Sequence, residues 1–306
     1  MKKSAAIAVS MVAALMAGSA MAQTATPVQD VKSWMHKDVG EAWASGYKGK
    51  GATVTIVDDF TGQFGRSTHD IGYGVKTNTH GQWVRDMITG VAPEAATKTH
   101  SMSTSASYSK VSLAKGLNVI NGSYGIYAPG KVSQAHALGG LYIRDKSVAN
   151  AAIQGTAVVV KAAGNDNIAM GDMNRSGYSD YLSVAMKNGK SVIFAGALNS
   201  HGTPEAQATK ASYSNFAGGD KAFQDRYLMV GVEGDKTGLY GTSFAAPQLS
   251  AYAAIVGSKF TTATPTKVAN QLLTTARTDT IAGYTPTIHG RGEASLSRAL
   301  APVAIQ

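Results

Sequence analysis

Four short apolar runs, each rich in β-branched residues, constrain the fold of this chain more than any other feature. They cover residues 52–57, 117–121, 157–160 and 191–196, and their length and composition are typical of strands buried on both faces. Helix-like stretches lie around them, at 31–44, 82–88, 133–141, 145–152, 247–260 and 266–276. Short buried strands that alternate with helices predict an α/β domain, with a mainly parallel central sheet and helices on both of its faces.

The N-terminus has the three parts of a secretory signal peptide. Lys2 and Lys3 form a basic start, residues 5–17 are apolar, and the segment 20–22, Ala-Met-Ala, supplies the small residues of a cleavage site. We therefore expect residues 1–22 to be removed and the protein to be secreted or periplasmic. A buried N-terminal helix is the alternative interpretation of this segment.

Composition excludes several classes of protein. The chain has 306 residues, of which 44% are hydrophobic and 15% charged, so it is not an intrinsically disordered protein. Beyond the N-terminus it has no apolar run of the roughly 18 residues that a membrane span needs. It contains no cysteine, which excludes disulfides, thiolate catalysis and cysteine-ligated metal centres. The formal net charge is +9, but the basic residues are spread along the chain, which argues against a nucleic-acid partner.

Polar residues follow three of the predicted strands. Asp58, Ser123 and Asn165 each stand at or just beyond a strand end. Functional residues of parallel sheets gather at the carboxyl ends of the strands, so these three side chains are candidates for one site. Each of them alone is more typical of a turn or of a helix cap.

The segment 241–247, Gly-Thr-Ser-Phe-Ala-Ala-Pro, is the most informative motif. A proline inside a helix costs about 3 kcal/mol, but it is harmless in the first turn. The helix at 247–260 must therefore begin just before Pro247, which places Ser243 at or beside its N-terminus, where backbone N–H groups can bind an anion. Helix capping is the alternative role for Ser243, but it does not explain the glycine, the threonine and the small residues together.

These segments resemble the motifs of the subtilisin-like serine proteases, the subtilases of peptidase family S8. The resemblance rests on 56–59 (Ile-Val-Asp-Asp), 80–84 (His-Gly-Gln-Trp-Val), 119–125 (Val-Ile-Asn-Gly-Ser-Tyr-Gly), 162–165 (Ala-Ala-Gly-Asn) and 241–247, in the order of the family. It extends from about residue 34 to residue 300. It implies a subtilisin-like three-layer fold and a secreted serine endopeptidase that works through an acyl-enzyme.

The resemblance also implies a role for each candidate residue. Asp58, His80 and Ser243 correspond to the catalytic triad, and Asn165 corresponds to the oxyanion donor. An unactivated serine is a poor nucleophile, so it needs a base within hydrogen-bond reach and a group that orients that base. The order Asp, His, Ser along the chain is that of subtilisin.

The resemblance also implies which residues bind the substrate. Other residues are alternatives for the catalytic roles or lie near them. The substrate-binding residues are Ser123, Tyr124, Gly125, Ala163 and Gly164. Tyr124 either narrows the pocket or offers it an apolar wall. Asp59 is the rival of Asp58, but neighbouring residues of a strand face opposite ways, and we place Asp58 first. We expect His69 to be structural. Lys161 either tunes the site electrostatically or is a solvated charge at a strand end.

Residues 23–306 show no linker, no break in composition and no repeat, so we expect one catalytic domain with a polar leader at 23–33. Subtilases usually carry a prodomain, yet residues 23–51 leave too little chain for an independent core. We therefore expect folding without a prodomain in cis, and a chaperone or inhibitor supplied in trans is the alternative.

A peptide or protein is the expected substrate. The chemistry calls for no metal or other cofactor, and no ligand loop indicates calcium, so a structural calcium ion stays an open question. The alternative function is a pseudoprotease that binds peptides without cutting them.

Overall fold

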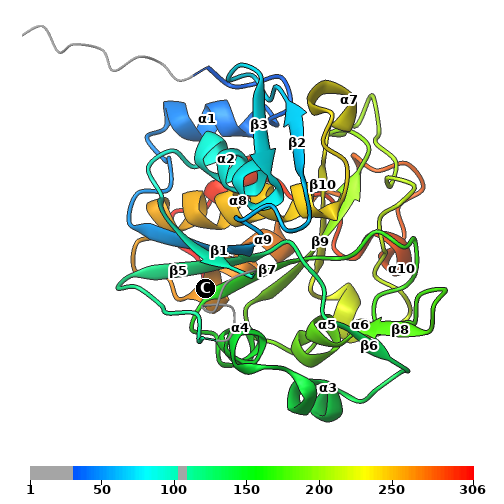
Figure 1. Ribbon diagram of the computed structural model, residues 1–306. Coiled ribbons are helices and arrows are strands. Elements are labelled where there is room, and N and C mark those ends of the chain that lie inside the picture. The colour runs from blue at the N-terminus through cyan, green and yellow to red at the C-terminus, as the bar shows by residue number, and fades with distance from the viewer. Residues whose placement is uncertain (1–29, 103–108) are drawn as a thin grey trace, which may run out of the picture. The chain divides into compact units, whose positions relative to one another are not determined.

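Six parallel strands form the central sheet of the computed structural model, which describes residues 30–102 and 109–306. Their order across the sheet is β10-β9-β7-β5-β1-β4 (Figure 1). The strands are β1 (Ala52–Asp58), β4 (Ala96–Ser101), β5 (Leu117–Gly122), β7 (Val158–Ala162), β9 (Val192–Leu198) and β10 (Tyr227–Gly231). Strands β1, β7, β9 and β10 are buried along their whole length, which explains why their sequences are largely continuous apolar runs. The predicted signal peptide, residues 1–22, lies outside the described residues.

Helices cover both faces of this sheet. One face carries α1 (Asp38–Ala44), α2 (His80–Val91), α8 (Ala245–Lys259), α9 (Pro265–Thr274) and α11 (Leu296–Leu300), and the other carries α3 (Gln134–Gly140), α4 (Ile143–Gln154), α5 (Tyr181–Met186) and α6 (Lys221–Gln224). Figure 1 shows α1, α2 and α8 above the sheet and α3, α4 and α5 below it. Each layer of helices closes its own apolar core cluster against the sheet. The predicted three-layer α/β fold is thereby confirmed for residues 31–306.

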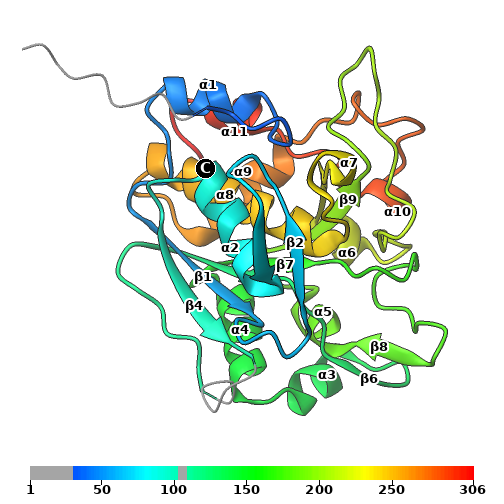
Figure 2. The same ribbon diagram turned by 45° about the horizontal axis from the view of Figure 1, so that its top comes forward.

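Short elements complete the described chain. They are β2 (Arg66–His69), β3 (Lys76–Thr79), β6 (Tyr127–Pro129), β8 (Tyr178–Asp180), α7 (Gly234–Thr237), the 3-10 helix η2 (Thr242–Phe244) and α10 (Pro286–His289). β2 and β3 form one antiparallel pair, and β6 and β8 form another. In Figure 2 the first pair lies beside α2 and the second lies beside α5. None of the helices that the structure describes is long and apolar enough to cross a bilayer.

The register of the sheet aligns the carboxyl ends of three adjacent strands. Val57 of β1 pairs with Gly122 of β5, and Gly122 pairs in turn with Lys161 of β7. The chain leaves all three strands at the same edge of the sheet. Asp58, which ends β1, Ser123, which follows β5, and the segment leading from β7 to Asn165 are therefore brought together there.

Two strands of the central sheet and the start of one helix differ from the prediction. Strands β4 and β10 are absent from the prediction because β4 is an exposed edge strand without an apolar run and β10 has one β-branched residue, Val230. The helix predicted at 31–44 begins only at Asp38. The residues before it are held instead by tertiary contacts, such as the 2.8 Å hydrogen bond from Trp34 Nε1 to the Ile71 carbonyl.

Gly257 in α8 permits the close packing of this helix on the sheet. We therefore expect Gly257→Ala to change the free energy of unfolding differently from Gly139→Ala. A Cβ on Gly257 would overlap the Leu117 side chain of β5, so Gly257→Ala should lower the free energy of unfolding by about 1–3 kcal/mol. Gly139→Ala, in α3, meets no atom within 4 Å and should be neutral or stabilising by up to about 1 kcal/mol. Urea unfolding of both variants tests this, and equal effects would contradict it.

Candidate active site

His80 is positioned by the N-terminal cap of α2. Thr79 Oγ1 accepts a hydrogen bond from Gln82 N at 3.3 Å, and Gln82 Oε1 accepts one from Thr79 N at 2.8 Å. This reciprocal capping box fixes where the helix begins, so that His80 is its first residue. The helix start lies against the end of β1, because a Cβ on Gly81 would come within 3.0 Å of Asp58 Cβ. Glycine at this position therefore lets His80 approach Asp58.

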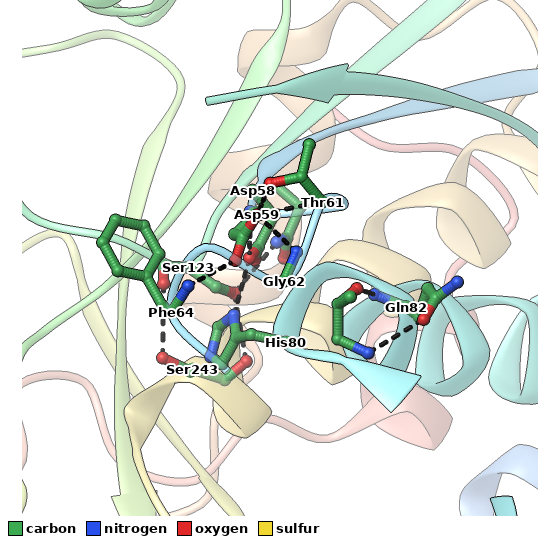
Figure 3. Close-up of polar contacts among 11 residues, drawn as sticks. Asp58, Asp59, Thr61, Gly62, Phe64, His80, Gln82, Ser123 and Ser243 are labelled. Carbon is green, nitrogen blue, oxygen red and sulfur yellow. Dashed lines mark hydrogen bonds and ion pairs between the residues drawn. The ribbon is translucent and has the colours of Figure 1, made fainter. Parts of the chain in front are cut away.

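Asp58 and His80 form a short, largely buried contact. Asp58 Oδ1 lies 2.6 Å from His80 Nδ1 (Figure 3), and the same oxygen accepts a 2.7 Å hydrogen bond from Asp59 N. Asp58 is 2% exposed, whereas the His80 side chain is 33% exposed. The contact directs the Nδ1–H of His80 toward the carboxylate, so Nε2 is the nitrogen that can accept another proton.

Asp58 also sets the charge state of the imidazole. Burial acts to lower the pKa of His80, but the hydrogen bond to Asp58 and the negative charge of Asp58 outweigh this effect, so the pKa of His80 is raised above 6.5. Burial raises the pKa of Asp58, and the hydrogen bond with His80 opposes that rise. His80 thus becomes a neutral, proton-accepting imidazole only above its usual titration range.

Asp59 and His69, the alternatives to Asp58 and His80, contact other parts of the structure. Asp59 accepts hydrogen bonds from three backbone N–H groups of the following loop, those of Thr61, Gly62 and Phe64. Figure 3 shows the loop folded around this carboxylate. His69 lies in the β2–β3 pair, where its ring packs edge-on to Trp83 at 5.6 Å between centroids. Both residues therefore organise loops, and Asp58 is the acid that contacts His80.

Ser243 lies in η2, directly before α8, as its position ahead of Pro247 predicts. The next residue, Phe244, packs against His80 with 5.6 Å between ring centroids. Ser243 and Ser123 exchange two hydrogen bonds: Ser243 Oγ donates to Ser123 O at 3.3 Å, and Ser123 Oγ donates to Ser243 O at 3.0 Å. In the described part of the chain, the Ser243 hydroxyl is thus directed to a backbone carbonyl, and no hydrogen bond joins it to His80.

Thr242 fixes the amide of Asn165. Asn165 Oδ1 accepts hydrogen bonds from Thr242 N at 2.8 Å and from Thr242 Oγ1 at 3.0 Å. Thr242 Oγ1 accepts in turn from Gly164 N at 3.0 Å. Because two donors occupy the amide oxygen, the amide NH₂ is the group left to face a ligand. The exposed Asn165 lines the same cavity as Ser243.

The cavity at this edge of the sheet has a volume of about 270 Å³. Its lining includes four of the five residues predicted to bind substrate, namely Ser123, Tyr124, Gly125 and Gly164. Ala163 lines the neighbouring cavity. Tyr124 is held as a wall by a 2.8 Å hydrogen bond from its hydroxyl to the buried carboxylate of Asp145.

Lys161 is not a solvated charge at a strand end, so this expectation is wrong. The residue is 1% exposed, and its Nζ lies 3.0 Å from Asp180 Oδ2 and donates a 2.6 Å hydrogen bond to Ala162 O. The strand end is buried because the β6–β8 pair, which ends in Asp180, covers it. Within the described residues, no group of three or more His, Asp or Glu side chains is arranged to hold a metal ion.

Thr242, Tyr127 and Asn174 are among the residues at this site for which the sequence predicted no role. Thr242 has a signal in the sequence, because it stands inside the motif 241–247. Tyr127 and Asn174 also line the cavity, but no local pattern marks them. They reach it through parts of the chain that are far apart in sequence, and only the fold brings them together.

Comparison with known proteins gives a family for the sequence and similar folds among solved structures. A sequence model described as the subtilase family, Peptidase_S8, matches residues 68–292, which include His80, Asn165 and Ser243. Among solved structures, the prenylagaramide maturation protease PagA is 18% identical, with a TM-score of 0.56 and 86% of this chain and 96% of PagA covered. The MycP3 protease of a type VII (ESX-3) secretion system is 20% identical, with a TM-score of 0.55 and 86% of both chains covered. A lanthipeptide protease is 17% identical, with a TM-score of 0.52 and 84% of this chain and 89% of that protease covered. No curated protein matches the sequence.

The contact between Asp58 and His80 predicts the titration of the histidine. Because Asp58 raises the pKa of His80 above 6.5, an NMR titration of the ring should show a midpoint above this value. Asp58→Asn should lower the midpoint, since the remaining effects are burial, which lowers the pKa of His80, and the weaker attraction of the negative charge of Asp59. Asp279→Asn, at an exposed ion pair with Arg298, is the matched control and should leave it unchanged. If Asp58→Asn left the midpoint unchanged, this would contradict the assignment of Asp58 as the residue that raises the pKa of His80.

Proposed function

Because this chain belongs to the subtilase family of serine peptidases, we propose that it hydrolyses peptide bonds with Ser243 as nucleophile, His80 as general base and Asp58 as the residue that orients the base. The 2.6 Å contact between Asp58 and His80 is the observation that carries this proposal. The resemblance of the sequence motifs and the packing of Phe244 against His80 support the place of Ser243 beside them.

In the proposed reaction, the Ser243 hydroxyl first turns from Ser123 O to His80 Nε2. This step calls for a rotation of the Ser243 side chain, and such rotations take picoseconds to nanoseconds in accessible side chains. His80 then takes the hydroxyl proton while Ser243 Oγ attacks the peptide carbonyl carbon. The imidazolium, stabilised by Asp58, gives this proton to the leaving amine, which leaves an acyl-enzyme. Water repeats the sequence and releases the acid.

Asn165 and the backbone of Ser243 are the proposed donors to the negative oxygen that develops during attack. The Asn165 amide NH₂ faces the cavity because Thr242 occupies its oxygen. Ser243 N belongs to the short turn ahead of α8, where N–H groups are free of helical partners. Donors that are already oriented stabilise charge without reorganising during the reaction.

A second candidate function is the binding of peptides without cleavage. One observation favours it: the Ser243 hydroxyl donates to Ser123 O rather than to His80. A pseudoprotease of this kind would keep the cavity and its lining residues but would not form an acyl-enzyme. Chemical labelling of Ser243 separates the two functions.

Labelling with a fluorophosphonate probe tests the nucleophile. The folded protein should react at Ser243, and Ser243→Ala should abolish the reaction. Ser45→Ala is the matched control: it removes an exposed serine hydroxyl that donates to Glu41 O and is outside the lining of the cavity beside Ser243, so labelling should persist. The labelling rate should rise with pH through a midpoint above 6.5, because only neutral His80 can accept the proton. A folded preparation that resists the probe, while a control protease reacts, would favour the binding function.

Substitution of Asn165 tests the oxyanion donor. Asn165→Leu should lower kcat by roughly 10²–10³ with little change in KM, a loss of the size that subtilisin shows when it loses one oxyanion donor. Asn165→Asp keeps an acceptor for Thr242 but removes the NH₂ donor, so it should lose kcat as well. If Asn165→Asp kept full turnover, Asn165 would serve only to hold Thr242 in place.

We also propose export of the protein and a peptide or protein substrate. The basic, apolar and small-residue parts of segment 1–22 support export. N-terminal sequencing of the exported protein should give Gln23 as its first residue, and a chain that retains Met1 would argue against it. The proposed chemistry uses only side chains and backbone, so it calls for no cofactor. A chaperone or inhibitor that acts in trans is the alternative to folding of the chain alone.

A further inference from the structure

We propose that Tyr127 makes this enzyme selective for a small side chain in the residue before the scissile bond. The inference rests on the proposed function and deepens it, because it names the substrate class of the same site. It is carried by the position of the Tyr127 ring, which lies between the two chain segments that wall the cavity beside Ser243.

The position of the substrate side chain follows from the chemistry. During attack the carbonyl carbon must lie beside Ser243 Oγ, with its oxygen toward Asn165. The side chain attached next to that carbonyl then points into the adjoining space, between the segments around Gly125 and Gly164, because Ser243, Asn165 and both glycines line one cavity. This cavity of about 270 Å³ must hold the scissile peptide group as well as that side chain.

The Tyr127 ring spans the space between these two glycines. A Cβ on Gly125 would lie 2.5 Å from Tyr127 Cε2 and 2.9 Å from Cζ, so the edge of the ring covers Gly125. A Cβ on Gly164 would lie 3.5 Å from the Tyr127 hydroxyl oxygen, which is van der Waals contact on the opposite side. A bulky substrate side chain would therefore have to occupy the volume of the ring.

Tyr127 also separates this cavity from a second one. Of the residues that the structure describes, Tyr127 alone lines both. The second cavity is lined in part by apolar side chains, Ile168 and Met170, and by Ala163. This second cavity has a volume of only about 10 Å³, so the room for a large apolar side chain would come from the volume of the removed ring, with Ile168 and Met170 beside it.

The surroundings keep the backbone of Tyr127 in place. Tyr127 is the first residue of β6 and pairs with Asp180 of β8. The Asp180 carboxylate is tied down by Lys161 at 3.0 Å and by Ser183 Oγ at 2.7 Å. The ring thus extends from an anchored strand into the cavity, although the residue as a whole is 45% exposed.

The test uses two peptides that differ only in the residue before the scissile bond, alanine in one and phenylalanine in the other. In the wild type, kcat/KM should favour the alanine peptide by roughly tenfold or more, the range that one side-chain pocket can supply. Tyr127→Ala should raise kcat/KM for the phenylalanine peptide by roughly tenfold or more and remove or reverse this preference. A wild type that prefers phenylalanine, or a Tyr127→Ala variant with an unchanged preference, would overturn the inference.

Two control variants separate the ring from other effects. Tyr127→Phe keeps the ring and should keep the preference of the wild type. Tyr178→Ala removes a tyrosine from β8 in the same antiparallel pair, one that lines the second cavity but not the first, and should keep it too. If Tyr178→Ala shifted the preference as strongly as Tyr127→Ala, general loosening of the pair would explain the result and the inference would fail.

A binding measurement keeps this test apart from that of the proposed function. Fluorescence anisotropy with the same two peptides, labelled, on Ser243→Ala and on Ser243→Ala/Tyr127→Ala should show the same change of preference in Kd. If the wild type reacts with the fluorophosphonate probe but neither kcat/KM nor Kd changes with Tyr127, only the inference on selectivity fails. If the probe does not react, the proposed function fails, and the Kd values still decide for or against Tyr127.

Discussion

The parallel register of β1, β5 and β7 is the constraint on which the site depends. It pairs Val57 with Gly122 and Gly122 with Lys161, so three chain segments leave the sheet side by side. Backbone hydrogen bonds and burial fix this register, because a slip by one residue would turn every buried side chain to the opposite face. The packing of the sheet, rather than the loops, therefore sets the positions of Asp58 and Ser123.

Side chains that bind backbone groups then orient the reactive residues. The capping box of Thr79 sets the first residue of α2, Asp59 holds the loop that follows β1, and Thr242 holds the amide of Asn165. Each of these side chains satisfies donors or acceptors that would otherwise lie unpaired at the end of a helix or strand. Polar groups that stabilise the local fold thus also position His80 and Asn165.

The ion pair of Lys161 and Asp180, beside the cavity, has a related structural effect. A lysine and an aspartate buried at this depth are tolerated because each partners the other and both have further hydrogen bonds. The ion pair of Lys161 and Asp180 anchors β8, and β8 in turn anchors the strand that carries Tyr127. The shape of the cavity therefore depends on an ion pair that lies outside the reacting groups.

The sequence by itself determined the fold class, the four strands with continuous apolar runs and the start of α8 near Ser243. These features follow from local composition and from the rule that a proline must lie in the first turn of a helix, so neighbouring residues are enough to predict them. Only the tertiary structure decided that Asp58 rather than Asp59 contacts His80, that Lys161 is buried, and that Tyr127 lines the cavity. Each of these outcomes depends on contacts between segments far apart in the chain, and a side chain's direction within such a contact is set by packing that no local pattern encodes.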